Sequence, residues 1–266
     1  AIIILTFPVA EGKLCRRSEV IILQNRMSNP AADPQPVEDV QGDERWMSLH
    51  HAYMLEGKER EPEVVFLGDS IFQQLQQTEI WHEMFEPMHC LNFSIGGDQT
   101  QHLLWRIQNG EVDSVQPKVL VLLVGTNNHG HTAQQVTGGI MEIISVLTNK
   151  QPQAQLVVMS LLPRGEKPNP LREKFATINK SLEMQLKDIP TATFLGVDPT
   201  IFYKSGTEEI GRQDMFDYLH LTKLGYQKLC EPLLEEIQSL LKDFVKVEST
   251  STETSSMAGE LASDQP

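Results

Sequence analysis

Short apolar runs alternate with amphipathic stretches through the middle of the chain. The apolar runs span residues 64–67, 90–93, 118–124, 155–162 and 193–197. Two of them, 118–124 and 155–162, are almost continuously apolar, as is typical of parallel strands that helices cover on both faces. The amphipathic stretches predict helices near residues 71–85, 100–109, 133–149, 171–187 and 223–244. This alternation predicts one doubly wound sheet in a three-layer α/β/α domain.

The two ends of the chain lack this pattern. Residues 28–40 are rich in Pro, Ala and Asp, and the end of the chain is rich in Ser and Thr. Both compositions favour disorder. Residues 1–26, which precede Met27, are interpreted as an upstream extension without a functional role. We therefore expect three segments: a disordered extension and arm (1–40), a folded domain (41–244) and a disordered tail (245–266).

Charge and cysteine content argue against several classes of protein. The formal net charge is −14, and such a surface repels phosphate backbones, which argues against binding of nucleic acid. No apolar run reaches the roughly 18 residues that a transmembrane helix needs. Three scattered cysteines without C-x-x-C spacing favour a reducing, cytoplasmic location over a disulfide framework or a zinc site.

Polar or glycine-rich segments follow the first four apolar runs. Ser70 comes after the first run, Gly97 after the second, Asn127 after the third and Arg164 after the fourth. In a parallel sheet the carboxyl ends of the strands lie at one edge, where ligands bind. The sequence therefore predicts that these residues gather at that edge.

Ser70 is either a residue that caps a helix or a nucleophile. A nucleophilic serine needs a histidine base, a group that orients the base, and donors that stabilise an oxyanion. Of the eight histidines, His220 lies between the last apolar run and the last predicted helix, and Asp217 precedes it by three residues. On one tight turn this spacing lets the carboxylate reach the imidazole. The alternatives are a turn residue at Asp217 and a polar core residue at His220.

Gly97 and Asn127 are candidate donors for the oxyanion. A glycine turn lets backbone N–H groups approach a substrate, and an asparagine amide is a further donor. A tight turn and an Asx turn are the corresponding structural alternatives. His129 and His131 form an H-x-H pattern, but no acidic or cysteine residues cluster near it, which favours a surface loop over a metal site.

Four short blocks carry a resemblance to a known family. Gly68-Asp69-Ser70, the Gly97 turn, Asn127 in "GTNN" and the Asp217-x-x-His220 pair together resemble the four blocks of the SGNH (GDSL) hydrolases. Longer segments such as "LNFSIGGDQTQHLLWRIQNGE" and "DMFDYLHLTKLGY" are similar to one branch of that family, the catalytic alpha subunits of type IB platelet-activating factor acetylhydrolases. This similarity covers the chain from about Val37 to Leu241.

The resemblance implies an SGNH hydrolase domain with a five-stranded, mostly parallel, flavodoxin-like sheet. It implies that Ser70 is the nucleophile, His220 the base and Asp217 the acid that orients it. The implied oxyanion hole consists of the N–H groups of Ser70 and Gly97 and the side chain of Asn127. The implied reaction removes the sn-2 acetyl group of platelet-activating factor through an acetyl-serine intermediate, with neither metal nor cofactor.

The resemblance also implies partners. These are a second catalytic subunit, in a homodimer or a heterodimer, and a WD40 β-propeller regulatory subunit, the lissencephaly protein. Two alternatives stay open: an O-acetylesterase or thioesterase acting on another small-acyl substrate, and a protein that serves mainly as a binding partner of the WD40 dynein regulator.

Three neighbours of the implied catalytic residues are candidates for an acyl pocket, namely Ile71, Thr126 and Leu219. Bulky side chains at these positions would admit an acetyl group and exclude long acyl chains. Ile71 is also a departure from the branch, which has leucine after the serine. Arg164 either faces a substrate phosphate or a partner subunit, or forms a salt bridge that holds its loop.

Overall fold

Five parallel strands form the centre of the protein. The computed structural model describes the backbone of residues 29–260 and the side chains of residues 29–244. The strands are β1 (Val64–Gly68), β2 (Cys90–Asn92), β3 (Val119–Leu123), β4 (Gln155–Met159) and β5 (Ala192–Leu195). All neighbours pair in parallel, and their order across the sheet is β2-β1-β3-β4-β5. This is the flavodoxin-like order, so the predicted fold class is confirmed.

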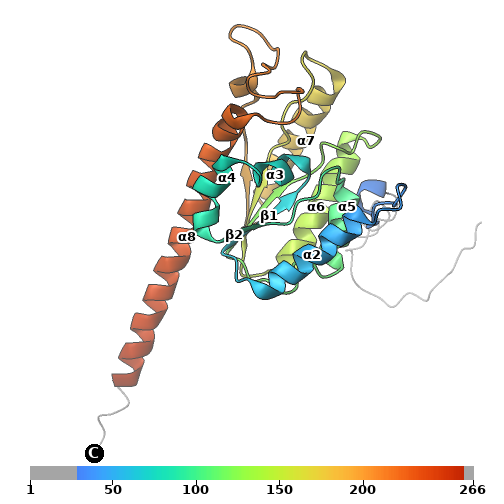
Figure 1. The fold of residues 1–266 in the computed structure, drawn as a ribbon. Coiled ribbons are helices and arrows are strands. Elements are labelled where there is room, and N and C mark those ends of the chain that lie inside the picture. The colour runs from blue at the N-terminus through green and yellow to red at the C-terminus, as the bar shows by residue number, and fades with distance from the viewer. Residues whose placement is uncertain (1–28, 261–266) are drawn as a thin grey trace, which may run out of the picture.

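Helices cover both faces of the sheet (Figure 1). On one face α5 (Thr100–Gln108), α6 (Ala133–Lys150) and α7 (Pro170–Leu186) pack side by side. On the other face α4 (Glu79–Met84) packs against α8 (Lys223–Glu260). Strands β1, β2 and β3 are buried along their whole length, which accounts for the apolar sequences of β1 and β3.

The helical pattern over residues 71–85 forms two helices rather than one. They are α3 (Ser70–Leu75) and α4, and the side chain of Thr78 accepts a hydrogen bond from the Trp81 N–H at the start of α4. This cap begins a second helix with its own direction. Short 3-10 helices also occur, at Pro30–Ala32, Glu86–Met88 and Pro199–Phe202.

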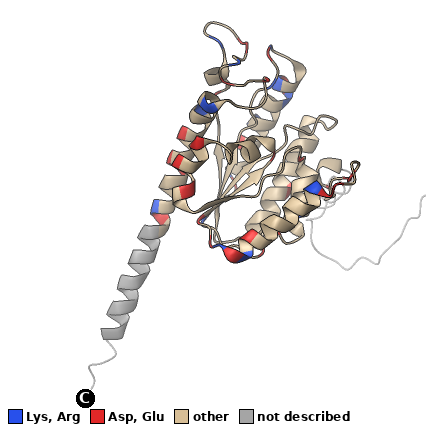
Figure 2. Ribbon diagram, in the orientation of Figure 1, with Lys and Arg blue, Asp and Glu red and all other residues tan. Residues whose placement is uncertain are grey.

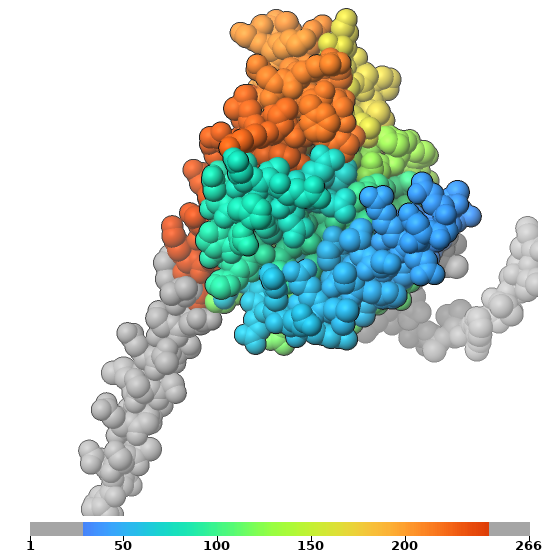
Figure 3. Space-filling model, viewed as in Figure 1, coloured from blue at the N-terminus to red at the C-terminus, as the bar shows by residue number. Residues whose placement is uncertain are grey.

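Helix α2 (Arg45–Glu59) is not predicted by the hydrophobic pattern. Its buried positions are His50, Tyr53 and Gly57 rather than an aliphatic stripe, so its periodicity is weak. On the face shown in Figure 3, α2 lies beside the segment that contains α3 and α4.

Parts of the two segments for which the sequence predicts disorder are described as packed or helical. Ala31 is fully buried, and its carbonyl accepts a hydrogen bond of 2.6 Å from Thr100 Oγ1, so the start of the arm is packed on the domain. Helix α8 continues to Glu260, beyond its predicted end near residue 244. From Leu233 to Ala258 the sequence has neither Gly nor Pro to end the helix. The predictions for residues 1–28 and 261–266 lie outside the described residues.

Two cysteines lie in the core. Cys90 and Cys230 are free and buried, as their apolar surroundings predict, whereas Cys15 is outside the described residues. Within residues 29–260, no helix combines the length and the apolar character that a membrane crossing requires.

Candidate active site

The carboxyl edge of the sheet brings Ser70, His220 and Asp217 together. Ser70 directly follows β1, and His220 lies just before α8, 150 residues further along the chain. Ser70 Oγ is 2.9 Å from His220 Nε2, and His220 Nδ1 is 2.7 Å from Asp217 Oδ2. The three side chains therefore form one continuous hydrogen-bonded chain.

The turn after β1 leaves the Ser70 hydroxyl free to meet His220. Asp69, not Ser70, is the N-cap of α3, and its Oδ1 accepts a hydrogen bond of 3.0 Å from the Ile71 N–H. Ser70 is the first helical residue. At Gly68 a Cβ atom would lie 2.4 Å from the Leu123 carbonyl oxygen, so only glycine lets β1 approach β3 this closely before the turn.

Asp217 holds the His220 ring from a tight loop. Its Oδ1 accepts hydrogen bonds from the backbone N–H groups of His220 and Leu219, at 2.7 and 3.1 Å, while Oδ2 faces Nδ1. Partial burial opposes ionisation, but the hydrogen bonds from His220 and Leu219 outweigh it and hold the pKa of Asp217 below its usual value. The carboxylate is therefore charged at neutral pH and can stabilise a protonated imidazole.

The glycine turn after β2 lies beside Ser70. A Cβ atom on Gly96 would be 3.6 Å from the Ser70 Cβ, and the Gly96 N–H donates to Gln73 Oε1 at 3.0 Å. Gly97 has a φ of 87°, in the left-handed region that favours glycine. Asn127 Nδ2 donates to the Asp98 carbonyl at 3.0 Å, so the amide from the end of β3 is joined to this turn.

A buried network that the sequence reading missed supports the same turn. Arg106 on α5 is fully buried; its Nε donates to Asp98 Oδ2 at 2.9 Å, and its Nη1 pairs with Glu111 Oε1. Trp46 Nε1 donates to Asp98 Oδ1 at 2.7 Å, and His50 Nδ1 lies 2.9 Å from Glu111 Oε2. One signal was available: a lone arginine stands among the apolar residues of the predicted helix over 100–109.

The candidate acyl-pocket residues differ in exposure. Ile71 and Thr126 are buried, and Leu219 is half-buried. Thr126 also contacts Arg164, whose Nη1 donates to the Thr126 carbonyl at 3.0 Å. His131 Nδ1 lies 3.0 Å from Asn128 Nδ2, and the residues that the structure describes contain no cluster of His, Cys, Asp and Glu suited to a metal ion.

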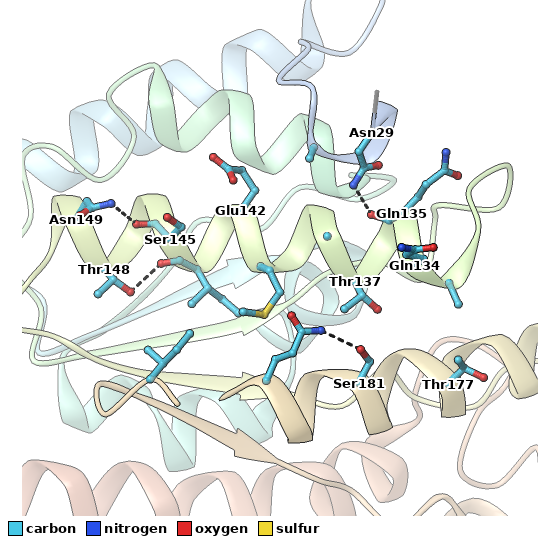
Figure 4. A pocket seen from close by; sticks show the side chains of 17 residues that line it. Asn29, Gln134, Gln135, Thr137, Glu142, Ser145, Thr148, Asn149, Thr177 and Ser181 are labelled. Atoms are coloured by element: carbon cyan, nitrogen blue, oxygen red, sulfur yellow. Dashed lines mark hydrogen bonds between the residues drawn. The ribbon is translucent and has the colours of Figure 1, made fainter. Parts of the chain in front are cut away.

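Two grooves differ in their distance from these residues. The larger, about 970 Å³, runs between α6 and α7, and many of its lining side chains are polar (Figure 4). The predicted site residues do not line it. The smaller, about 860 Å³, is lined by Gly96 and Gly97 with Trp46 and Gln73, and so it borders the turn beside Ser70.

Burial of Asp69 makes stability depend on pH. Complete burial raises the pKa of Asp69 to about 7 from 3.8, although the Ile71 N–H opposes the shift. The folded carboxyl group thus keeps a proton that the unfolded one loses, so this residue makes the protein less stable as pH rises from about 4 to 7. Asp69→Asn, which keeps the acceptor for Ile71, should gain stability relative to the wild type between pH 5 and pH 8, measured by urea unfolding.

Asp198→Asn is the matched control for that experiment, because Asp198 is also an N-cap aspartate but is exposed. The hydrogen bond from the Thr200 N–H lowers the pKa of Asp198, so its titration lies below this pH range and the difference from wild type should stay constant. Parallel pH curves for Asp69→Asn and the wild type would show that Asp69 is charged throughout.

A serine, a histidine and an aspartate in hydrogen-bonded series, at the carboxyl edge of a parallel α/β sheet, form the constellation of a serine hydrolase. The comparisons with known proteins agree. Residues 66–228 match the GDSL-like Lipase/Acylhydrolase family. The chain belongs to this family and is a carboxylic ester hydrolase, so the family resemblance read from the sequence is confirmed.

Two relatives and one solved structure show the extent of the similarity. Platelet-activating factor acetylhydrolase IB subunit alpha1 of Bos taurus is 54% identical over 213 residues, which are 80% of this chain and 91% of that protein. Subunit alpha2 of Rattus norvegicus is 51% identical over 216 residues, 81% of this chain and 93% of that protein. The fold matches a GDSL-like lipase from Bacteroides thetaiotaomicron with a TM-score of 0.60 and 18% identity, over 73% of this chain and 98% of that one.

Proposed function

We propose that this protein removes the sn-2 acetyl group of platelet-activating factor, and of related short-acyl esters, through an acetyl-serine intermediate on Ser70. The observation that carries the proposal is the hydrogen-bonded series of Ser70, His220 and Asp217. The named activity of relatives that are more than half identical supports the choice of substrate.

The reaction consists of two acyl transfers. His220 Nε2 takes the proton of the Ser70 hydroxyl as Oγ attacks the ester carbonyl carbon, and Asp217 stabilises the imidazolium that forms. The bond to the glycerol oxygen then breaks, and this oxygen leaves with the proton from His220. Water attacks the acetyl-serine in the same way, returns the proton through His220, and releases acetate.

The N–H groups of Ser70 and Gly97 and the Asn127 amide are the proposed oxyanion donors. The glycine turn lies against Ser70, and Asn127 is hydrogen-bonded to the residue after Gly97. Donors fixed in this way need no reorganisation as negative charge develops on the carbonyl oxygen.

The names of the relatives support a proposed assembly. The relatives are named subunits, which favours an assembly of this chain with a second catalytic subunit. A WD40 β-propeller regulatory protein as a further partner, and a cytoplasmic location, come from the resemblance of the sequence to that branch.

The length of the acyl chain provides the test of this function. We expect release of the sn-2 acyl group from a choline phospholipid to be fastest for acetyl and much slower for octanoyl, because Ile71, Thr126 and Leu219 line the proposed acyl pocket. Leu219→Ala should raise the octanoyl rate relative to the acetyl rate. Both rates are measured from the free acid released.

Leu224→Ala is the matched control, since Leu224 is a leucine on α8 whose side chain is 43% exposed. It should leave the ratio of the two rates unchanged. If the wild-type protein cleaved octanoyl and acetyl esters equally fast, the short-acyl assignment would be wrong.

A further inference from the structure

The Arg164 guanidinium lies where three active-site loops meet. Its Nη1 donates to the Thr126 carbonyl at 3.0 Å and lies 3.4 Å from Thr126 Oγ1. Thr126 directly precedes Asn127 in the sequence. The N–H of Gly165, the residue after Arg164, donates to the Tyr218 carbonyl at 2.8 Å, within the loop that holds His220. The guanidinium is therefore held at the segment that carries Asn127, and the backbone after Arg164 is joined to the loop that carries His220.

The charge of Arg164 has no close counter-ion among residues 29–244. No described carboxylate lies within 4.0 Å of its guanidinium, so a salt bridge does not explain its position. Its contacts with Thr126 and His129 are made through Nη1, which leaves the Nε and Nη2 donors for a ligand. Partial burial lowers the pKa of Arg164, because removing the guanidinium from water disfavours its charged form.

A second cation stands on the same rim. Lys174 Nζ donates to the Asn128 carbonyl at 2.7 Å and lies 3.5 Å from the His129 carbonyl. Burial, together with the charges of Arg164 and Lys174, lowers the pKa of His129. Figure 2 shows Lys and Arg residues at the start of α7, the helix that carries Lys174. In a chain with a net charge of −14, this cationic rim (Arg164 and Lys174) favours an anionic ligand.

We propose that Arg164 binds the phosphodiester of the substrate and so determines specificity for acetyl esters that carry this anion. The inference rests on the proposed function and extends it. In an sn-2 acetyl glycerophospholipid only a few bonds separate the ester oxygen from phosphorus. A carbonyl held between Ser70 and Asn127 thus brings the phosphate within reach of a guanidinium that contacts Thr126. The planar guanidinium fork matches two phosphate oxygens.

Two matched substrates test this assignment: a 1-alkyl-2-acetyl-glycerophosphocholine below its micellar concentration, and the 1-alkyl-2-acetylglycerol that lacks only the phosphocholine. Arg164→Gln should lower kcat/KM on the phospholipid by about 10- to 100-fold, mainly through KM, because a charged hydrogen-bond pair is lost. The neutral ester should be cleaved at nearly the wild-type rate. Arg164→Lys should recover part of the loss.

Arg212→Gln is the control for loss of a positive charge. Arg212 is exposed and stacks on the Tyr218 ring of the His220 loop, at 5.1 Å from the ring centroid. It should leave the ratio of the two activities unchanged. An equal loss on both esters in Arg164→Gln would mean that Arg164 only holds the Thr126 loop, and no loss on either would place the phosphate elsewhere; both results overturn the proposal.

Inhibition separates this proposal from the proposed function. Glycerophosphocholine, which has the phosphodiester but no ester, should compete with the neutral ester in the wild type and about 10- to 100-fold more weakly in Arg164→Gln. This result can be obtained even if the wild type fails to cleave the phospholipid, in which case only the proposed function is wrong. Competition by inorganic phosphate as strong as that by glycerophosphocholine would assign the site to free phosphate instead.

Discussion

Replacing Ser70 with alanine is expected to lower kcat on acetyl esters by about 10⁶-fold, the scale of loss when a triad serine is removed. The substitution deletes the Oγ atom that lies 2.9 Å from His220 Nε2, so no acyl-serine can form. Steady-state hydrolysis of a soluble acetyl ester measures the effect. A fluorophosphonate probe should label the wild-type protein at Ser70 and leave the variant unlabelled.

Asn127→Ala provides a graded comparison. It removes one of three proposed donors, so kcat should fall by only about 10²- to 10³-fold. Urea unfolding of Ser70→Ala should match that of the wild type, because the cap of α3 is the side chain of Asp69. A Ser70→Ala variant as active as Asn127→Ala, or labelling of another serine, would remove Ser70 from the role of nucleophile.

The sheet and the triad were predictable for one physical reason. Parallel strands covered on both faces must be apolar throughout, so they stand out as runs such as residues 118–124. Once strands are located, the chemistry must lie just after them, which selected Ser70, Gly97 and Asn127 from the many polar residues. The structure places Ser70 against His220, with the glycine turn beside Ser70 and Asn127 joined to that turn through Asp98.

The missed features depend on buried polar groups as well as on apolar contacts. Helix α2 packs on the domain through the Tyr53 hydroxyl, which donates to the Ser94 carbonyl at 2.9 Å, and through His50, which pairs with Glu111. Ala31 is likewise fixed by the Thr100 hydroxyl. Such contacts join residues far apart in sequence, so the local hydrophobic periodicity of the sequence does not predict them.

The second large effect is expected on stability, at Arg106. Arg106→Met should lower the free energy of unfolding by about 3–5 kcal/mol, because it leaves the buried carboxylates of Asp98 and Glu111 without their cation. Methionine keeps most of the aliphatic volume, so the change is chiefly one of charge. Urea unfolding at neutral pH measures it.

Lys223→Met is the matched control, since the Lys223–Glu79 pair is exposed at 64% and 69%, and its loss should leave the free energy of unfolding nearly unchanged. Adding Asp98→Asn and Glu111→Gln to Arg106→Met should recover stability if uncompensated charge is the cause, whereas a packing defect would persist. Equal costs at Arg106 and Lys223 would contradict the account. The Asp98 carbonyl accepts a hydrogen bond from Asn127, so Arg106→Met should also reduce kcat. That result would link the buried ion pairs to the proposed oxyanion donors.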